Sequence, residues 1–263
     1  MTNPDAPLVL RHDDDRGVCT LTLNRPAAFN ALSEEMLTAL QSELDQLSKS
    51  QKLRVLVIAA SGKAFCAGHD LRQMRAEPSM DYYQKLFSQC GEMMMSIQKL
   101  QVPVIAKVQG IATAAGCQLV AQCDLAVASS EAKFAVSGVN LGLFCATPSV
   151  ALSRNVSRKA AFEMLVTGDF LNAEDALKQG LINQIAAPEE LDACLENLLA
   201  KILSKPQVAL AMGKELFYMQ LETGIEKAYE YASQTMACNM MDNSALEGVQ
   251  AFIEKRKPNW SAT

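Results

Sequence analysis

The sequence contains few of the residues that build metal sites. Only two of its 263 residues are histidine, and none of its eight cysteines forms a Cys-x-x-Cys pair. Structural zinc sites are made from such pairs and from histidine, so no metal site is expected. The sequence also lacks a run of 18 uncharged apolar residues, which a membrane-spanning helix requires. We therefore expect a function without a bound metal ion and without insertion into a membrane.

Basic residues are not in excess either. The net charge is −5, which argues against a broad nucleic-acid-binding surface. Hydrophobic residues make up 49% and charged residues 20% of the chain, a mixture typical of a globular protein with a substantial core. The first residues, MTNPDAP, show no signal or transit pattern, and unpaired cysteines suit a reducing compartment. These features predict a cytoplasmic protein with free thiols.

Strands alternate with helices through most of the chain. Residues 18–23 alternate apolar and polar side chains, and residues 55–60 are apolar throughout, as in a strand covered on both faces. Ser33 is expected to cap a helix whose apolar residues recur at helical spacing. That apolar stripe consists of Met36, Leu37, Leu40, Leu44 and Leu47.

The chain after residue 100 repeats this alternation and then becomes helical. Residues 102–108, 125–128 and 133–136 are predicted strands, and residues 112–117 are expected to open a helix. Thr147 before Pro148 is read as the N-cap of another helix. Strand patterns stop near residue 190. The sequence therefore predicts an α/β core over residues 1–195 and a helical region over residues 196–263.

Two turns join a buried strand to a helix through small residues, within residues 55–74 and 104–127. Small side chains let a ligand approach the backbone, and free N–H groups at a helix start favour negative charge. Two such N–H groups that converge would form an oxyanion hole for a thioester or ester carbonyl. Tight packing of strand against helix is the alternative explanation of the same residues.

Five motifs in order resemble the crotonase (enoyl-CoA hydratase/isomerase) superfamily over nearly the whole chain. They are NRP with NAL (24–26 and 30–32), FCAGHDL (65–71), AGCQL with CD (115–119 and 123–124), FLNAEDA with GLI (170–176 and 180–182), and AFIEKR (251–256). Residues 114–129 and 139–148 resemble one subgroup of that family in particular.

The resemblance implies a spiral of ββα turns with a helical C-terminal region that serves as a trimerisation or lid element. It implies a homotrimer or a dimer of trimers that binds an acyl-CoA, with coenzyme A present only as part of the substrate. By position, the backbone N–H groups of His69 and Ala115 would hold the thioester oxygen. The residues implied for substrate and coenzyme A binding are Arg25, Ala67, His69, Asp70, Leu71, Arg72 and Gly116.

The sequence departs from the family where its hydratases carry two glutamates. Gln118 stands at the first position and Gly138 at the second. An amide does not exchange protons near neutral pH, and glycine has no side chain to do so. Because a positioned acid or base contributes about 10²–10⁴-fold, at most slow hydration is expected. Replacing both residues by glutamate should raise hydratase activity if the pocket is otherwise intact.

Other side chains are candidates for the missing proton transfer. Cys145 could act as base or nucleophile, with its pKa lowered at the Thr147 helix start, although a buried structural thiol is the simpler interpretation. His69 could present its imidazole to the pocket, or point elsewhere. Asp70 is better explained as a helix cap.

Three functions remain open from the sequence. The first is an acyl-CoA enzyme of the enoyl-CoA hydratase/isomerase type, in fatty acid metabolism. The second is an acyl-CoA-binding protein with little or no catalysis. The third is an oligomeric scaffold without a small-molecule ligand.

Overall fold

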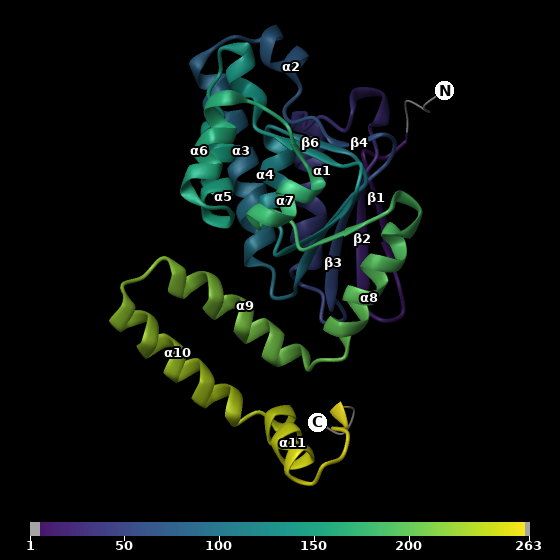
Figure 1. Cartoon of the computed structure of the whole chain (residues 1–263), viewed down its shortest axis with the longest axis vertical. Helices are drawn as coiled ribbons and strands as arrows, with labels where there is room; N and C mark the ends of the chain where they lie inside the picture. Colours follow the sequence, from purple (N-terminus) through teal and green to yellow (C-terminus); the bar gives the residue numbers. More distant parts are fainter. Residues whose placement is uncertain (1–5, 261–263) are drawn as a thin grey trace. The chain divides into compact units, whose positions relative to one another are not determined.

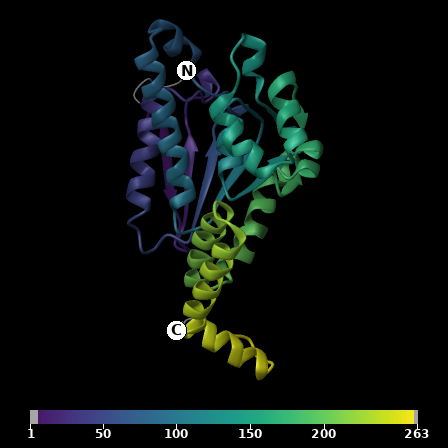
Figure 2. The ribbon, with the colours of Figure 1, turned by 90° about the vertical axis from the view of Figure 1, so that its left-hand side faces the viewer.

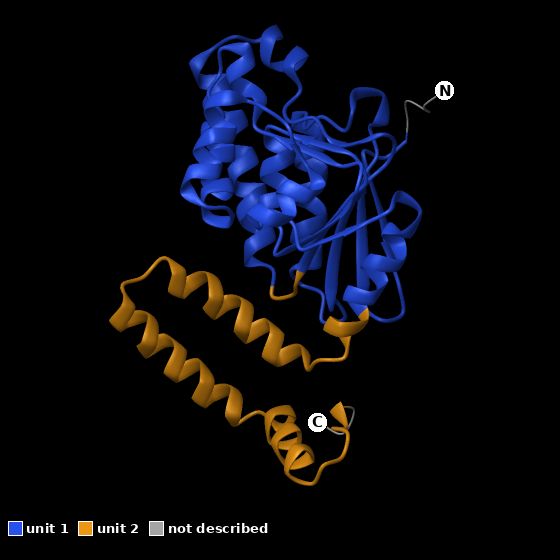
Figure 3. Cartoon of the chain, in the orientation of Figure 1, with its two compact units in different colours: residues 1–100, 104–199 blue, residues 101–103, 200–263 orange. Residues whose placement is uncertain are grey.

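The computed structural model describes residues 6–260, which form two compact units (Figure 3). The first unit runs to Leu100 and continues over Val104–Leu199. The second comprises Gln101–Pro103 and the chain from Ala200 onward. The boundary expected after residue 195 falls inside helix α8 (Leu191–Leu203), slightly before the point where the units divide.

The first unit contains a six-stranded sheet in the order β1-β2-β3-β5-β7-β10. β1 and β2 pair antiparallel, and the remaining neighbours pair parallel. The strands are β1 (Val9–Asp13), β2 (Val18–Leu23), β3 (Val55–Ala60), β5 (Val104–Val108), β7 (Leu125–Ser129) and β10 (Gln184–Ala186).

A smaller sheet has the order β4-β6-β8-β9. Its strands are β4 (Ala64–Cys66), β6 (Ile111–Thr113), β8 (Lys133–Ala135) and β9 (Leu171–Asn172). The pairs β3–β4, β5–β6 and β7–β8 each give one strand to each sheet before the chain continues into helical structure. This repetition is a spiral of ββα turns, so the predicted α/β fold class is confirmed.

Helices cover the sheets of the first unit, with α1 packed against α3 and α4 against α5 (Figure 1). In Figure 2 the purple and blue helices stand side by side, next to the teal helices. The helices are α1 (Glu34–Leu47), α2 (Leu71–Ala76), α3 (Met80–Lys99), α4 (Ala115–Gln122), α5 (Ala146–Asn155), α6 (Arg158–Thr167) and α7 (Ala173–Gln179). Short 3-10 turns lie at Pro26–Ala28, Ser137–Leu141 and Pro188–Glu190.

The start of α1 follows from its sequence. Ser33 accepts a hydrogen bond from the backbone N–H of Met36 at 3.2 Å, which satisfies one of the free donors of the first turn. Glu34 and Glu35 follow in that turn, where the helix dipole favours carboxylates. The whole predicted apolar stripe of this helix is buried. The predicted cap and core face are therefore confirmed.

The predicted start of α5 is wrong. The helix begins at Ala146, with Cys145 as an N-cap whose side chain makes no capping hydrogen bond. Thr147 and Pro148 both lie in the first turn. Proline is tolerated there because the early N–H groups have no acceptor within the helix in any case. A Thr-Pro pair therefore marks the vicinity of a helix start without fixing its first residue.

The second unit is helical, as predicted for the chain after residue 190. Beyond α8 it contains α9 (Gln207–Leu221), α10 (Ile225–Met240) and α11 (Asn243–Ile253), with α9 and α10 packed on each other. Trp260 donates its indole N–H to the Ser204 carbonyl at 3.0 Å. Within residues 6–260, no helix combines the length and the apolar character needed to cross a bilayer.

Candidate active site

The two small-residue turns predicted from the sequence meet at a cavity of about 290 Å³ in the first unit. Leu71, Met74, Phe87, Leu143 and Phe144 are among its apolar lining residues. None of the residues that line it, all within the described chain, is Asp, Glu, Lys or Arg. Residues 6–260 also form no cluster of three His, Cys, Asp or Glu side chains suited to a metal ion.

The first turn follows β4 and is held on both sides of His69. The Leu32 N–H donates to the Gly68 carbonyl at 2.7 Å, and the Asp70 N–H donates to the Leu32 carbonyl at 3.3 Å. The N–H of His69 lies between these bonds and has no backbone acceptor among the described residues. Gly68 has a φ of +90°, a conformation that glycine adopts without a steric cost.

The second turn follows β6 and ends at the first residue of α4. Ala114 has φ 50° and ψ −121°, an unusual backbone conformation for alanine, and its N–H donates to the Ala135 carbonyl at 2.9 Å. Ala115 is the first helical residue, so its N–H has no intrahelical partner. A Cβ on Gly116 would overlap the carbonyl oxygen of Cys66, which explains why only glycine fits there.

The two turns lie against each other. A Cβ built on Gly68 would be 2.8 Å from the Ala114 Cβ and 3.2 Å from the Ala115 nitrogen. His69 and Ala115 line the same cavity, together with Ala67. The structure therefore brings together two residues whose backbone N–H groups are free of backbone acceptors.

Asp70 caps helix α2, as the sequence predicts. Its carboxylate accepts from the backbone N–H groups of Arg72 and Gln73 and pairs with the Arg25 guanidinium at 2.7 Å. Burial alone would raise the pKa of Asp70, but Arg25 and the two N–H donors outweigh it, so the net shift is downward. Arg25 and Asp70 do not line the cavity, whereas Leu71 does. Arg72 is exposed and lies outside the cavity lining.

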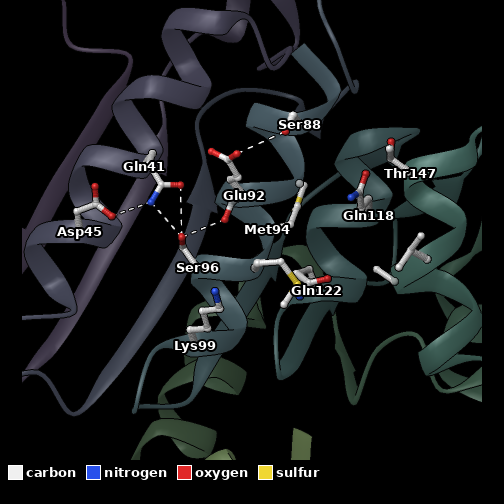
Figure 4. Close-up of a pocket in the computed structure, with 14 residues that line it drawn as sticks. Gln41, Asp45, Ser88, Glu92, Met94, Ser96, Lys99, Gln118, Gln122 and Thr147 are labelled. Carbon is white, nitrogen blue, oxygen red and sulfur yellow. Dashed lines mark hydrogen bonds between the residues drawn. The ribbon is translucent and has the colours of Figure 1, made fainter. Parts of the chain in front are cut away.

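Gln118 lines a different hollow, of about 760 Å³, between α1, α3, α4 and α5 (Figure 4). Its side chain is buried, and its Oε1 atom has no hydrogen-bond partner within the described residues. Gln41, Glu92 and Lys99 also line this hollow, which gives it a polar character. Thr147 lines both spaces. The structure therefore separates Gln118 from the cavity that His69 and Ala115 share, with Thr147 between them.

Cys145 occupies the space beside Gly138. The Gly138 N–H donates to the Cys145 Sγ at 3.3 Å. A Cβ on Gly138 would be 2.5 Å from the Leu143 carbonyl oxygen and 2.7 Å from the same Sγ. Burial raises the pKa of the Cys145 thiol, and the Gly138 N–H opposes this effect only in part. The pKa of this thiol is therefore shifted upward, opposite to the predicted lowering, because burial outweighs the Gly138 N–H.

The His69 imidazole lies in the cavity wall. Its ring meets the Phe87 ring edge-on, with 5.4 Å between centroids. Both ring nitrogens are buried and have no hydrogen-bond partner among the described residues. Burial lowers the pKa of His69, with a smaller opposing effect of the Leu32 backbone. Burial therefore favours the neutral form of the imidazole.

Sequence reasoning missed Phe87 and Met74 as cavity residues. Leu86, Cys90 and Met93 form the buried stripe of α3, and Phe87 lies beside that stripe. A large apolar side chain next to the core face of a helix indicates a further apolar contact. The sequence does not identify the residues that make this contact. Only the fold shows that α3 passes the turn containing His69.

Comparisons with known proteins show the family to which the chain belongs. Residues 13–263 match the enoyl-CoA hydratase/isomerase family. The crystal structure of an enoyl-CoA hydratase from Mycobacterium smegmatis is 64% identical, covers 97% of this chain and 100% of its own, and superposes with a TM-score of 0.96. The structure of human enoyl Coenzyme A hydratase domain-containing protein 3 is 43% identical, with the same coverage and a TM-score of 0.92.

Sequence relatives give the same result. Mouse enoyl-CoA hydratase domain-containing protein 3, mitochondrial, is 46% identical over 93% of this chain and 82% of its own length. A protein named crotonyl-CoA hydratase from Syntrophomonas wolfei is 32% identical over 94% of this chain and 96% of its own. The subgroup resemblance carried by residues 114–129 and 139–148 is thereby confirmed. The chain belongs to the enoyl-CoA hydratase/isomerase family.

Proposed function

We propose that this protein is an acyl-CoA enzyme that holds the substrate thioester carbonyl between the backbone N–H groups of His69 and Ala115. The observation that carries the proposal is that both residues line one apolar cavity and neither N–H has a backbone acceptor within the described chain. The relative named crotonyl-CoA hydratase supports an acyl-CoA as the ligand.

Such a site favours reactions that pass through an enolate. When a proton leaves the carbon next to the thioester, negative charge collects on the carbonyl oxygen. Two N–H donors already aimed at that oxygen stabilise this charge more than they stabilise the neutral ground state. The apolar walls that surround the site keep water away and strengthen the effect.

Hydration is not the reaction that the cavity supports best. Gly138 offers no side chain, Gln118 lines the neighbouring hollow, and no carboxylate lines the cavity. The same observation favours a second candidate, an acyl-CoA-binding protein with little or no catalysis. Both candidates share the ligand, so binding and turnover have to be measured separately.

We also propose an entry path for the ligand and an assembly of the chain. The acyl-CoA enters near Leu71 and Arg72, which lie at the start of α2. The second unit mediates a homotrimer or a dimer of trimers. A cytoplasmic location stays a prediction, because the mouse relative is named as mitochondrial.

Filling the cavity tests the ligand site. Calorimetric titration with butanoyl-CoA should show binding to the natural protein, and Ala67→Phe should weaken it at least tenfold because the ring occupies the cavity. Ala76→Phe adds the same ring to an exposed position at the end of α2 and is the matched control. If Ala67→Phe binds as well as Ala76→Phe, the acyl group does not enter this cavity.

Turnover distinguishes the two candidates. Loss of the enoyl absorbance of crotonyl-CoA, compared with buffer and with Gln118→Ala, measures hydration. We expect a slow rate that Gln118→Ala changes little, since Gln118 does not line the cavity. A fast rate that depends on Gln118 would contradict this interpretation of the site.

A further inference from the structure

The imidazole of His69 is an unexplained polar group in an otherwise apolar wall. Nδ1 and Nε2 are both buried and have no well-formed hydrogen bond within the described residues; the Leu32 backbone and the edge of the Phe87 ring lie beside the imidazole. Leaving such a group unpaired costs free energy, and an orphaned polar group in a native site calls for an explanation such as a catalytic role. The ring belongs to the same residue that offers its N–H to the thioester.

The other polar groups of the cavity are either already paired or unsuited to proton transfer. The Ser137 hydroxyl is bonded to the Thr113 hydroxyl at 2.9 Å. The Cys145 sulfur accepts the Gly138 N–H, and its thiol has a raised pKa. His69 is the one lining residue that combines a basic nitrogen with a charge change near neutral pH.

We propose that the His69 imidazole is the general base that removes the proton from the carbon next to the thioester. The inference rests on the proposed acyl-CoA function. The imidazole would lie close to that carbon, because the ring and the N–H that holds the thioester oxygen belong to one residue. Catalytic hydrogen bonds often form only when substrate is bound, so the proposed role requires the ring to turn a nitrogen towards that carbon when the acyl group enters.

The step balances without a further reactant. A neutral ring nitrogen takes the proton from Cα, and the C–H electron pair becomes part of the enolate. The negative charge on oxygen is held by the N–H groups of His69 and Ala115. The imidazolium then returns a proton to Cα, which restores the substrate, or to the γ-carbon of a 3-enoyl thioester, which moves the double bond to the 2-position.

A single base points to a class of reaction. Hydration needs one group to deprotonate water and another to protonate Cα. A double-bond shift needs only one group, which takes a proton and gives it back. The proposal therefore favours 3-enoyl thioesters over 2-enoyl thioesters as substrates.

Hydrogen exchange tests this step without requiring net turnover. The protein is incubated with butanoyl-CoA in D₂O, and mass spectrometry measures deuterium in the acyl group. We expect incorporation by the natural protein and about a 100-fold lower rate for His69→Gln, which hydrogen-bonds but does not exchange protons. The matched control is His12→Gln, which removes the other histidine, on an exposed part of β1.

Calorimetry on the same samples separates the possible failures. Binding of butanoyl-CoA to His69→Gln within about threefold of the natural protein shows that the variant is folded and loaded. If the natural protein binds butanoyl-CoA and His69→Gln leaves the exchange rate unchanged, the role of His69 is overturned but the proposed function is not. The same holds if exchange is lost only in Cys145→Ser. Binding to the natural protein without any exchange does the same. No binding to the natural protein overturns the proposed function, and with it this inference.

The pH dependence of the exchange rate distinguishes a base from a purely structural role of His69, which would not produce such a dependence. The groups beside the ring are the Leu32 backbone before α1 and Phe87 in α3, on which Tyr83 is stacked; Cys145 lines the same cavity. Asp70 follows in the chain and is paired with Arg25. The exchange rate should be flat near pH 7 and fall at acidic pH, below the ordinary pKa of histidine, as the base becomes protonated. A rate that rises tenfold per pH unit throughout this range would instead indicate hydroxide.

Discussion

At the scale of single residues, the space around Gly138 decides which chemistry the cavity can hold. A side chain there would press on the Leu143 carbonyl, which belongs to the backbone and cannot move aside cheaply, and on the Cys145 sulfur. The sequence alone led us to expect that glutamates at 118 and 138 would raise hydratase activity. Because even a Cβ at position 138 crowds both groups, the pocket does not stay intact in the double variant, and we expect no gain in hydratase activity from it.

Gly138→Ala should therefore lower the free energy of unfolding, by about 1–3 kcal/mol. Gly91→Ala is the control, since a Cβ on Gly91 in α3 meets nothing within 4 Å. That substitution should raise the free energy of unfolding by roughly 0.5–1 kcal/mol through helix propensity. Urea denaturation of both variants measures the difference. Equal stability of the two would mean that the Gly138 site is more open than the structure indicates.

Ala114 carries the strain at the second turn. Its φ of 50° and ψ of −121° are expensive for any residue with a Cβ. Ala114→Gly should raise the free energy of unfolding by roughly 1 kcal/mol, because the relief of strain exceeds the entropy cost of glycine. Ala121→Gly, in the last turn of α4, should instead lower it, because glycine favours the helix less than alanine and the buried methyl group is lost. Chemical denaturation measures both free energies of unfolding. A lower stability of Ala114→Gly than of Ala121→Gly would show that the Ala114 backbone is not strained.

At the scale of elements, the sequence predicted the parts that carry a strong local signal. The apolar run of β3 was predicted with its observed bounds, and α1 with its N-cap and its buried stripe. The strands β4, β6 and β9 were missed, because two or three residues are too few to show an alternation. The smaller sheet exists only through pairing between distant segments, and its strands place both turns at the cavity.

The cap of α2 is an element with a pH-dependent contribution. The pKa of Asp70 in the folded protein lies below its unfolded value of about 3.9. The cap and the Arg25 pair therefore contribute fully above that pH, and the contribution is lost as pH falls through the lower folded pKa. Asp70→Ala should cost about 1–2 kcal/mol at pH 7, and the cost should shrink towards pH 2.

Thermal unfolding of Asp70→Ala at several pH values measures this effect. Asp15→Ala, at an exposed turn, provides the control and should leave the pH dependence as it is. A cost for Asp70→Ala that stays constant down to pH 2 would show that the charge of this carboxylate does not stabilise the helix start.

At the scale of the whole molecule, a single chain leaves large apolar side chains in the second unit uncovered. Phe252 is 86% exposed and Tyr229 is 70% exposed. Neither α9 nor α10 contains a buried residue. Exposed apolar surface of this kind marks an interface in soluble proteins. This supports the proposal that the helical second unit mediates assembly.

We expect the natural protein to sediment as a trimer or hexamer of 28.5 kDa chains. The double variant Tyr229→Glu/Phe252→Glu should shift it towards smaller species, since charges are costly in an apolar interface. Met80→Glu changes an exposed apolar residue of the first unit and is the control. Sedimentation of the natural protein as a single chain at micromolar concentration would contradict the assembly.

One comparison of two ligands tests most directly whether the backbone N–H groups of His69 and Ala115 bind the thioester carbonyl. Butanoyl-CoA and its thioether analogue S-butyl-CoA differ chiefly in the carbonyl oxygen that the two backbone donors would hold. Two hydrogen bonds at about 1 kcal/mol each correspond to an affinity difference on the order of tenfold or more. Calorimetry should therefore find the thioester bound at least tenfold more tightly. Equal affinities would show that no group in the cavity forms a stabilising hydrogen bond with the carbonyl oxygen.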